Sequence, residues 1–312
     1  MRYSRNLGLS RPKKSEAERS KIMEITKKAY AKINLGLDVL GKRDDGYHLV
    51  KMIMQNVDIY DTLTFRRTAE GKITLKANDD TIPVDDSNLI CKVAKQLQEK
   101  YGVTYGAEIE LVKRIPVAAG MAGGSTDGAA AYRALNDLWE LGLSDKELCE
   151  LAVKLGADIP YCIVGGTALS EGIGEVLTPI DDKAKYHLVV AKPDIMVSTG
   201  WVYTELDSTE ITRHPDIDAV KAALSEGDVK RMCDEIHNVL EPVTTAKYRV
   251  IKDIEKILED NGAVRAFMTG SGPTVFAVFD NENMAKKGFE AVKKSGLAPQ
   301  LFLTKPIDPA QV

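Results

Sequence analysis

A strict alternation of apolar and polar residues marks the first clear element of the chain. From residue 29 to residue 39 every second side chain is apolar, and the side chains between them are polar or small. Successive side chains of a strand point to opposite faces, so this period of two predicts a half-buried β-strand. Lys32 and Asn34 fall together on the face that points away from the core. That face is either solvated, as most lysines are, or available to a ligand.

Similar patterns predict the remaining elements. Further strands are expected over residues 49–59, 61–67, 72–77, 107–115, 162–170, 187–191, 264–268, 274–279 and 300–304. Helices are expected from Ser87 as N-cap to Gly102, from near Asp127, from a capping box at 144–147 to Gly156, after Ser198, and over 216–225, 228–240, 244–260 and 282–294. The last third of the chain follows a β-α-β-β-α-β order, which favours an α+β sandwich with helices on one face of an antiparallel sheet.

Composition and charge narrow the class of protein. A chain of 312 residues suggests two domains, and a proline with mixed aspartates and lysines at 177–185 places their boundary, giving 22–180 and 181–312. The net charge of −4 argues against general nucleic-acid binding, and no apolar run is long enough to span a membrane. The four cysteines form no C-x-x-C pair, which argues against a zinc or dithiol site and fits a cytoplasmic protein. Residues 1–21 are basic and polar and predict a disordered tail.

A glycine-rich segment separates the strand expected at 107–115 from the helix that follows. Residues 116–126 read Pro-Val-Ala-Ala-Gly-Met-Ala-Gly-Gly-Ser-Thr. Where such a loop leads into a helix, the unpaired N–H groups of the first turn and the helix dipole form an anion site. Ser125 and Thr126 could cap the helix or offer a hydroxyl to a metal-bound phosphate. The spacing is neither that of a P-loop nor that of a dinucleotide motif, so a simple tight turn stays an alternative.

Other polar residues stand beside predicted turns. Tyr47 and His48 follow the turn at 43–46, where they either pack or hold a planar ring. Asp158 lies between a helix end and Pro160, a position where aspartate also serves simply to brace a turn. Asn88 stands at the start of a helix, as capping support or as a polar contact to a ligand.

Five segments of the chain together resemble a known family. The sequences Ala-Lys-Ile-Asn at 31–34, the loop at 116–126 and Gly-Ser-Gly-Pro-Thr-Val-Phe at 270–276 resemble the GHMP kinase superfamily. Asp-Gly-Tyr-His at 45–48 and Gly-Ala-Asp-Ile-Pro at 156–160 are similar to one branch, whose substrate is a cytidine-diphosphate-linked methylerythritol. The resemblance extends from about residue 27 to residue 306.

This resemblance implies a fold and a reaction. The N-terminal domain should resemble ribosomal protein S5 domain 2, and the C-terminal domain should be ferredoxin-like, with the active site in the cleft between them. ATP, with Mg²⁺, would phosphorylate the 2-hydroxyl of the methylerythritol moiety, on the route to isoprenoid precursors, in a protein that is compatible with a homodimer. Asp158 would be the general base, and Lys32 would keep it ionised and offset charge near the acceptor oxygen.

The resemblance also assigns binding positions. The ATP positions are Asn88 and Lys113 near the adenine and, along the loop, Pro116, Val117, Ala118, Ala119, Gly120, Met121, Ala122, Gly123, Gly124, Ser125 and Thr126, with Ser125 nearest to the Mg²⁺-bound phosphate. The cytidine positions are Asn34, Tyr47 and His48, with Tyr203 as a second aromatic wall. Some family members carry glycine at 118, 119 and 122, and alanine fits there if φ is negative.

Two alternatives follow from the same residues. A different GHMP kinase, such as a mevalonate or homoserine kinase, would share the loop, but the Tyr47-His48 pair argues against it. A nucleotide-binding protein without catalysis would have no need of a general base, and the presence of both Lys32 and Asp158 argues against that.

Overall fold

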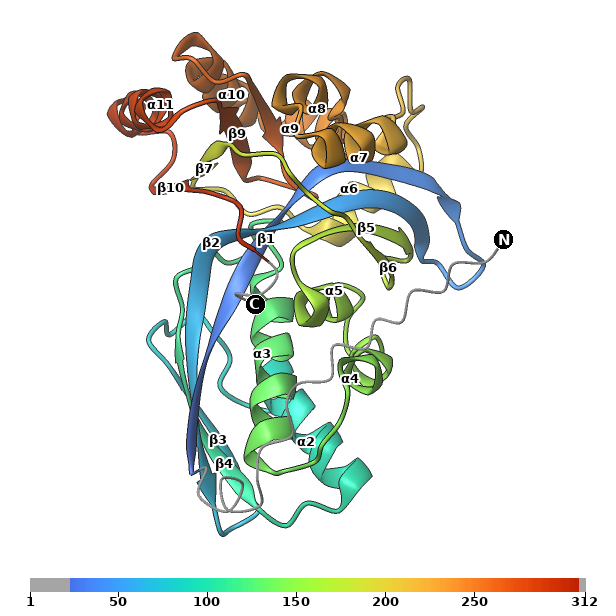
Figure 1. Ribbon diagram of the computed structural model, residues 1–312, viewed down its shortest axis with the longest axis vertical. Coiled ribbons are helices and arrows are strands. Elements are labelled where there is room, and N and C mark those ends of the chain that lie inside the picture. The colour runs from blue at the N-terminus through green and yellow to red at the C-terminus, as the bar shows by residue number, and fades with distance from the viewer. Residues whose placement is uncertain (1–22, 309–312) are drawn as a thin grey trace.

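Two β-sheets, stacked along the long axis of the molecule, organise the protein (Figure 1). This computed structural model describes residues 23–308, and the tail predicted at 1–21 lies outside the described residues. The first sheet contains β1 (Glu24–Lys42), β2 (His48–Thr68), β3 (Ile73–Ala77), β4 (Gly106–Val112), β5 (Thr167–Gly172) and β6 (Val176–Pro179). The second contains β7 (His187–Lys192), β8 (Arg265–Met268), β9 (Val275–Phe279) and β10 (Gln300–Thr304).

Strands β1 and β2 form the long hairpin on which the first sheet is built. Its strand order is β3-β4-β2-β5-β6, with β1 paired to β2, and only the β3–β4 pair is parallel. This part of the chain also contains four helices: α2 (Leu89–Tyr101), α3 (Gly123–Leu138), α4 (Asp145–Ala152) and α5 (Ile159–Val164). Helix α3 packs directly on β1 and β2 and therefore lies under the centre of the hairpin.

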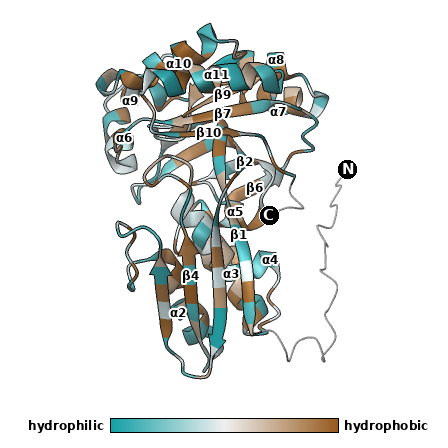
Figure 2. Ribbon diagram, turned by 90° about the vertical axis from the view of Figure 1, so that its left-hand side faces the viewer, coloured by the Kyte–Doolittle hydropathy of each residue, from teal (hydrophilic) through white to brown (hydrophobic). Residues whose placement is uncertain are grey.

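The second sheet has the strand order β10-β7-β9-β8, and every pair in it is antiparallel. Its helices are α6 (Thr199–Leu206), α7 (Ile217–Glu226), α8 (Val229–Glu235), α9 (Glu241–Lys247), α10 (Val250–Asp260) and α11 (Glu282–Ser295). Helices α10 and α11 pack on each other and on β9, as the β-α-β-β-α-β order predicted. Figure 2 shows hydrophilic residues along the outer sides of helices such as α8 and α11, above strands that carry hydrophobic residues.

Strand β1 is buried on both faces, whereas the alternation predicted a half-buried strand. Residues 29–39 are all buried. Ala31, Ile33 and Leu35 belong to a cluster that also contains Leu188 of β7 and Phe276 of β9, so this face packs against the second sheet. Helix α3 also packs on this strand, and Ala29, Leu37 and Val39 share a second cluster with its residues. A residue pattern records which side chains are apolar, but not that a second domain covers the strand.

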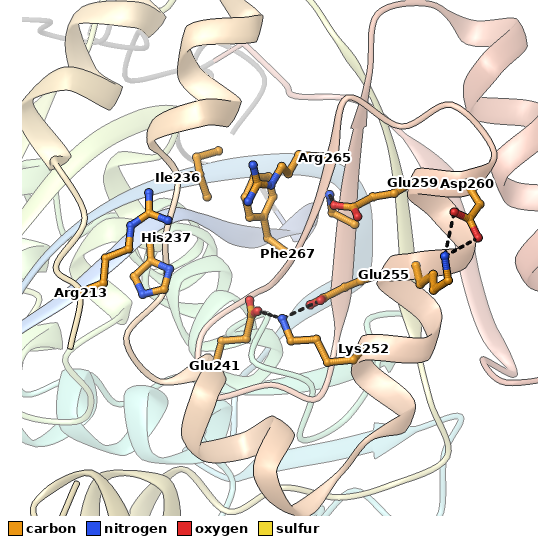
Figure 3. Close-up of a pocket in the computed structure, with 12 residues that line it drawn as sticks. Arg213, Ile236, His237, Glu241, Lys252, Glu255, Glu259, Asp260, Arg265 and Phe267 are labelled. Carbon is orange, nitrogen blue, oxygen red and sulfur yellow. Dashed lines mark hydrogen bonds and ion pairs between the residues drawn. The ribbon is translucent and has the colours of Figure 1, made fainter. Parts of the chain in front are cut away.

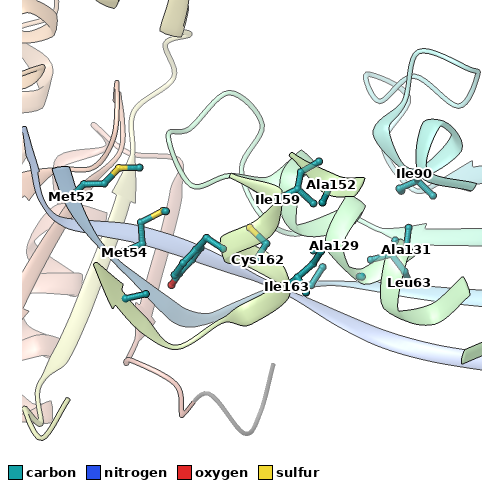
Figure 4. Packing of buried hydrophobic residues seen from close by; sticks show 14 of the residues in the cluster. Met52, Met54, Leu63, Ile90, Ala129, Ala131, Ala152, Ile159, Cys162 and Ile163 are labelled. Atoms are coloured by element: carbon teal, nitrogen blue, oxygen red, sulfur yellow. The ribbon is translucent and has the colours of Figure 1, made fainter. Parts of the chain in front are cut away.

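The strand predicted at 162–170 is wrong in its first part, where the structure has helix α5. The structure has a helix at Ile159–Val164 and begins β5 only at Thr167. Pro160 stands in the first turn, where a missing N–H costs nothing. A short, fully buried apolar run cannot be assigned to helix or strand by periodicity. Figure 4 shows Ile159, Cys162 and Ile163 of this helix among the buried residues near α3.

Several predicted boundaries shift by a few residues. The N-cap of α2 is Asn88 and not Ser87, and α3 begins at Gly123 and not near Asp127. Helix α4 has the predicted capping box but ends at Ala152, before Gly156. Two helices, α9 and α10, replace the one predicted at 244–260, and α8 ends at Glu235. Among the described helices, none is long and apolar enough to cross a membrane.

Candidate active site

A cavity of about 540 Å³ lies where the two sheets meet the loop between β4 and α3. The residues predicted as site residues that line it are Lys32, Asn34, Asn88, Lys113, Pro116, Val117, Ala118, Ala119, Gly120, Ala122, Gly123, Gly124, Ser125, Asp158 and Tyr203. They come from β1, α2, the β4–α3 loop, the start of α3, the start of α5 and α6. Folding therefore brings segments that are far apart in the sequence to one open cavity.

The first turn of α3 opens onto this cavity without a side-chain cap. Its N-cap is Ala122, which has no side-chain acceptor for the first N–H groups. Gly123, Gly124 and Ser125 of the first turn line the cavity. Unpaired N–H groups and the positive end of a helix dipole favour an anion at this position. This geometry is suited to an anionic group such as phosphate.

Two alanines of the loop adopt the left-handed conformation that normally selects glycine. The φ angles are +50° at Ala118 and +57° at Ala122. The sequence-based condition that alanine fits here with negative φ is therefore not met. Left-handed backbone costs an L-residue about 1–2 kcal/mol. The loop keeps the path that glycines would allow, and it carries backbone strain at both positions.

Lys32 is buried at the floor of the cavity, 5% exposed, and its ammonium is held in place. Its Nζ donates to Asn34 Oδ1 at 2.6 Å and to the Gly120 carbonyl at 3.3 Å. Its backbone N–H donates to the Met121 carbonyl at 3.2 Å. The pairing of β1 with β2 shifts register between Tyr30 and Lys32, which lets this backbone reach the loop.

Asp158 stands at the N-terminus of α5, where its side chain makes no capping hydrogen bond. Burial and the charge of Asp158 raise the pKa of Tyr203 to about 12. Burial raises the pKa of the Cys162 thiol, Asp158 adds to this effect, and Lys32 opposes it. The charges of Asp158 and Lys32 therefore both act on the Cys162 thiol, which is buried. No ion pair among the described residues joins Lys32 to Asp158, because the ammonium is engaged with Asn34 and the loop.

The structure brings together part of the predicted cytidine site. The rings of His48 and Tyr203 lie with centroids 4.7 Å apart and planes tilted by 32°. His48 Nε2 is 2.6 Å from Asp207 Oδ1, and hydrogen bonds from Lys42 and His48 hold the pKa of Asp207 below its usual range. Tyr47, in contrast, is 58% exposed. Asp207 was not predicted, since nothing in its local sequence marks it.

Asn88 and Lys113 are already engaged in hydrogen bonds at the cavity wall. Asn88 Oδ1 accepts from Ile90 N at 2.9 Å as the N-cap of α2, and its Nδ2 donates to the Pro83 carbonyl at 2.6 Å. Lys113 Nζ lies 2.6 Å from carboxylate oxygens of both Asp61 and Asp127. Sequence analysis did not single out these two carboxylates, which are far from each other along the chain.

Two residues predicted for ATP binding direct their side chains elsewhere. Met121 is 1% exposed and packs in the cluster between the sheets. Thr126 donates its hydroxyl to the Tyr30 carbonyl of β1 at 2.8 Å and is buried. Thr126 therefore neither caps α3 nor presents a hydroxyl to the cavity, which leaves Ser125 as the hydroxyl of this turn that lines it.

A second cavity, of about 400 Å³, lies beneath α9 and α10 of the C-terminal part (Figure 3). It is lined mainly by charged residues and contains none of the predicted site residues. Lys252 forms ion pairs with Glu241 and Glu255 in it. Burial, with the charge of Glu241, raises the pKa of Glu255 to about 7.

The fold and this site define a kinase of the GHMP class. Residues 88–166 match the family model of the GHMP kinase N-terminal domain, and residues 219–297 match that of the C-terminal domain. The chain is 46% identical over 281 residues to 4-diphosphocytidyl-2-C-methyl-D-erythritol kinase of Lachnoclostridium phytofermentans, covering 90% of this chain and 97% of that one. It is 47% identical over 281 residues to the kinase of the same name from Clostridium acetobutylicum, covering 90% and 99%.

A solved structure agrees with these relatives. A crystal structure of 4-(cytidine 5'-diphospho)-2C-methyl-D-erythritol kinase matches with a TM-score of 0.77 at 27% identity, covering 91% of this chain and all of that one. The chain belongs to the 4-diphosphocytidyl-2-C-methyl-D-erythritol kinase family. The resemblance to this branch of the superfamily and the two-domain fold expected from it are thereby confirmed.

Proposed function

We propose that the protein transfers the γ-phosphoryl group of ATP to the 2-hydroxyl of 4-diphosphocytidyl-2-C-methyl-D-erythritol, giving the 2-phosphate and ADP in the methylerythritol phosphate pathway. One observation carries this proposal: a single cavity holds Lys32, Asp158 and the uncapped start of α3, in a chain that is 46% identical to a kinase of that name. An acceptor hydroxyl and a triphosphate can meet there.

The phosphate loop acts by position and electrostatics. The N–H groups at the start of α3 would bind the triphosphate, and the adenine would lie beside Asn88. Phosphoryl transfer needs little covalent help from a protein, because the charge in the transition state spreads over phosphoryl oxygens that fixed dipoles can stabilise. The strained loop thus acts as a preformed cradle.

Asp158 serves as the general base. Its carboxylate is partly exposed at the cavity wall and makes no capping bond, so it is available to accept the proton of the substrate hydroxyl. Such a base contributes about 10²–10⁴-fold to the rate. Lys32 places a positive charge at the cavity floor, where Asn34 and the Gly120 carbonyl fix its position and where it offsets charge on the transferred group.

The cytidine moiety would lie against the aromatic pair of His48 and Tyr203. Stacking of a base on an aromatic side chain contributes about 1–3 kcal/mol. The ring of His48 is fixed by Asp207 at 2.6 Å, which orients it before the substrate arrives. Tyr203 lines the cavity, whereas Tyr47 and His48 lie outside its lining, so these two residues would contact the substrate at the rim.

Mg²⁺ would enter with ATP. Across residues 23–308 there is no group of three or more histidine, cysteine, aspartate or glutamate side chains that could hold a metal ion. Mg²⁺ in kinases binds mostly through phosphate oxygens and water, with only one or two protein ligands. Ser125, on the open first turn of α3, is the hydroxyl placed to complete its shell. Bound there, the ion would neutralise charge on the phosphates.

A substrate panel tests the proposal. ADP release is measured by a coupled assay with the cytidine-linked methylerythritol, mevalonate and homoserine, each with Mg·ATP. We expect turnover with the first substrate alone. Turnover with mevalonate or homoserine instead would support another GHMP kinase. Tight ATP binding without turnover of any of the three would support a nucleotide-binding protein without catalysis.

A further inference from the structure

A buried cluster of three charged side chains lies at the two ends of the loop between β4 and α3, residues 113–122, which we call the phosphate loop. Lys113 Nζ is 2.6 Å from Asp61 Oδ2 and 2.6 Å from Asp127 Oδ2. The side chains of Asp61, Lys113 and Asp127 are 0%, 6% and 6% exposed. They come from β2, from the residue after β4 and from the start of α3, so one ammonium joins three elements. We call Asp61, Lys113 and Asp127 the triad.

Asp61 holds the chain where it enters the loop. Its Oδ1 accepts hydrogen bonds from the backbone N–H groups of Arg114 and Ile115, at 2.5 and 2.8 Å. Its Oδ2 accepts from the Lys113 side chain at 2.6 Å. Three consecutive residues are therefore fixed to one carboxylate on β2. A carboxylate that accepts several charged and backbone donors is a strong and directional anchor.

Lys113 links this anchored segment to the other end of the loop, where α3 begins. Its second carboxylate partner, Asp127, is in the helix whose first turn lines the cavity. The two ends of the loop are also in close contact: a Cβ built on Gly123 would lie 3.0 Å from Lys113 Nζ and 3.1 Å from Ile115 Cγ2. The triad therefore sets the distance between the exit of β4 and the start of α3.

The triad has one ammonium for two carboxylates. All three side chains are almost fully buried, and burial raises the pKa of Asp127 well above its usual range, opposed by Lys113 and reinforced by Asp61. Within residues 23–308, Asp127 Oδ1 has no hydrogen-bond partner. Lys113 and Asp127 also line the cavity. The charges that stabilise the loop thus lie beside the space where the nucleotide would bind.

We propose that the triad is a positioning unit, which holds the N–H groups of α3 at the spacing that the ATP phosphates require. Lys113 acts through Asp61 and Asp127, and its ammonium, engaged by both carboxylates, does not act as a free ligand for the nucleotide. This inference rests on the proposed function for the identity of the nucleotide. It predicts that damage to the triad weakens ATP binding selectively, because the cytidine end of the cavity is built by other elements.

The test compares two substitutions whose side chains, like that of aspartate, branch at Cγ, one polar and one apolar. Asp127→Asn keeps an oxygen that accepts from Lys113, whereas Asp127→Leu removes it. We expect Asp127→Leu to raise KM for ATP at least tenfold and to change KM for the cytidine substrate less than twofold. Asp127→Asn should stay within threefold of the wild type for both. Asp61→Asn should behave like Asp127→Leu, because both oxygens of Asp61 accept hydrogen bonds and an amide N–H₂ there would face either the Lys113 ammonium or the backbone N–H groups of Arg114 and Ile115.

Lys27→Met is the matched control. Lys27 pairs with Asp137 at 3.1 Å, near the other end of the same helix, so this variant removes an ion pair of α3 without touching the loop. We expect its KM for ATP to equal that of the wild type. A double-mutant cycle with Lys113→Met and Asp127→Leu should give a double variant no worse than the poorer single one.

Two results would overturn the positioning role. One is an unchanged KM for ATP in Asp127→Leu. The other is an equal rise in KM for both substrates, or an equal rise in Lys27→Met, which would indicate general destabilisation. Binding of an ATP analogue, measured by calorimetry on the folded variants, keeps the test independent of the phosphoryl acceptor. If the wild type binds ATP but does not phosphorylate the cytidine substrate, the proposed function fails while the triad can still be judged.

Discussion

Gly120, in the loop between β4 and α3, and Gly270 of the second domain are in backbone contact at one side of the cavity. A Cβ on Gly270 would be 3.0 Å from the Gly120 carbonyl oxygen, and a Cβ on Gly120 would be 2.5 Å from the carbonyl oxygen of Thr269. Both residues have positive φ, +70° and +57°. Glycine is thus required at this junction for two reasons, conformation and space. The contact fixes the loop against the second sheet and closes one side of the site.

Substitution of Gly120 should therefore damage catalysis more than the backbone conformation alone explains. In Gly120→Ala the new Cβ must displace the 269–272 backbone, and a small misplacement at a reacting centre can cost about 100-fold in rate. Gly142→Ala is the control, because Gly142 also has positive φ, +69°, but nothing lies within 4 Å of its Cβ. We expect kcat/KM to fall about 100-fold in the first variant and to stay near wild type in the second. Equal activity of the two would contradict the contact.

Replacing the strained alanine at the start of α3 with glycine should stabilise the protein. Ala122 has φ +57°, so Ala122→Gly should raise the free energy of unfolding, by about 1 kcal/mol. Ala119, in the same loop, is not among the residues with positive φ, and Ala119→Gly should lower stability by about 0.5–1 kcal/mol. Urea unfolding of the two variants measures the difference. A loss of stability in Ala122→Gly would show that the left-handed conformation is not costly here.

Asp158 provides the sharpest test of the chemistry. Asp158→Asn removes the proton acceptor while keeping the size of the side chain, so turnover should fall by about 10²–10⁴-fold. ATP affinity should be unchanged, because the phosphate site is built from α3 and the loop. Single-turnover kinetics and ATP binding are measured together. Normal turnover would remove Asp158 from the mechanism.

The aromatic wall of the cytidine site can be tested at Tyr203. Tyr203→Leu removes the ring that lies 4.7 Å from His48, and KM for the cytidine substrate should rise about 5- to 150-fold, the equivalent of 1–3 kcal/mol of stacking. Tyr203→Phe keeps the ring and should stay close to wild type. KM for ATP should not move in either variant. A Leu variant with normal KM would place the base elsewhere.

Stability should depend on pH through Glu255. Burial raises the pKa of Glu255 in the folded protein to about 7, from an ordinary value of 4.5. A carboxyl with a raised folded-state pKa contributes stability at low pH that is lost as the pH rises through that pKa. The groups around it are Glu241, Lys252, Lys256, Glu259, Asp260, His237, Arg213 and Arg265.

Thermal unfolding from pH 5 to pH 8 measures this effect. The melting temperature of Glu255→Gln should fall less over this range than that of the wild type. Glu290→Gln, an exposed carboxylate on α11, should follow the wild-type curve. Parallel curves for all three proteins would show that Glu255 does not titrate in this range.

The sequence by itself determined most of the secondary structure and the composition of the site. The alternation at 29–39, the glycine-rich loop and the capping box each depend on contacts between residues close in sequence, and such local preferences are legible in the chain. The five motifs also identified the family. The local residue pattern did not predict helix α5, because a buried apolar run with a proline fits a helix and a strand alike.

Tertiary structure alone decided how these pieces work together. The partners of Lys32 are Asn34 and a loop carbonyl, and not Asp158, because the fold closes the loop over β1. Asp61 and Asp127 meet one lysine only after β2, β4 and α3 have packed. The left-handed angles at Ala118 and Ala122 likewise come from the fixed ends of the loop. Burial, charge pairing and backbone strain depend on segments far apart in the chain, and no local pattern encodes them.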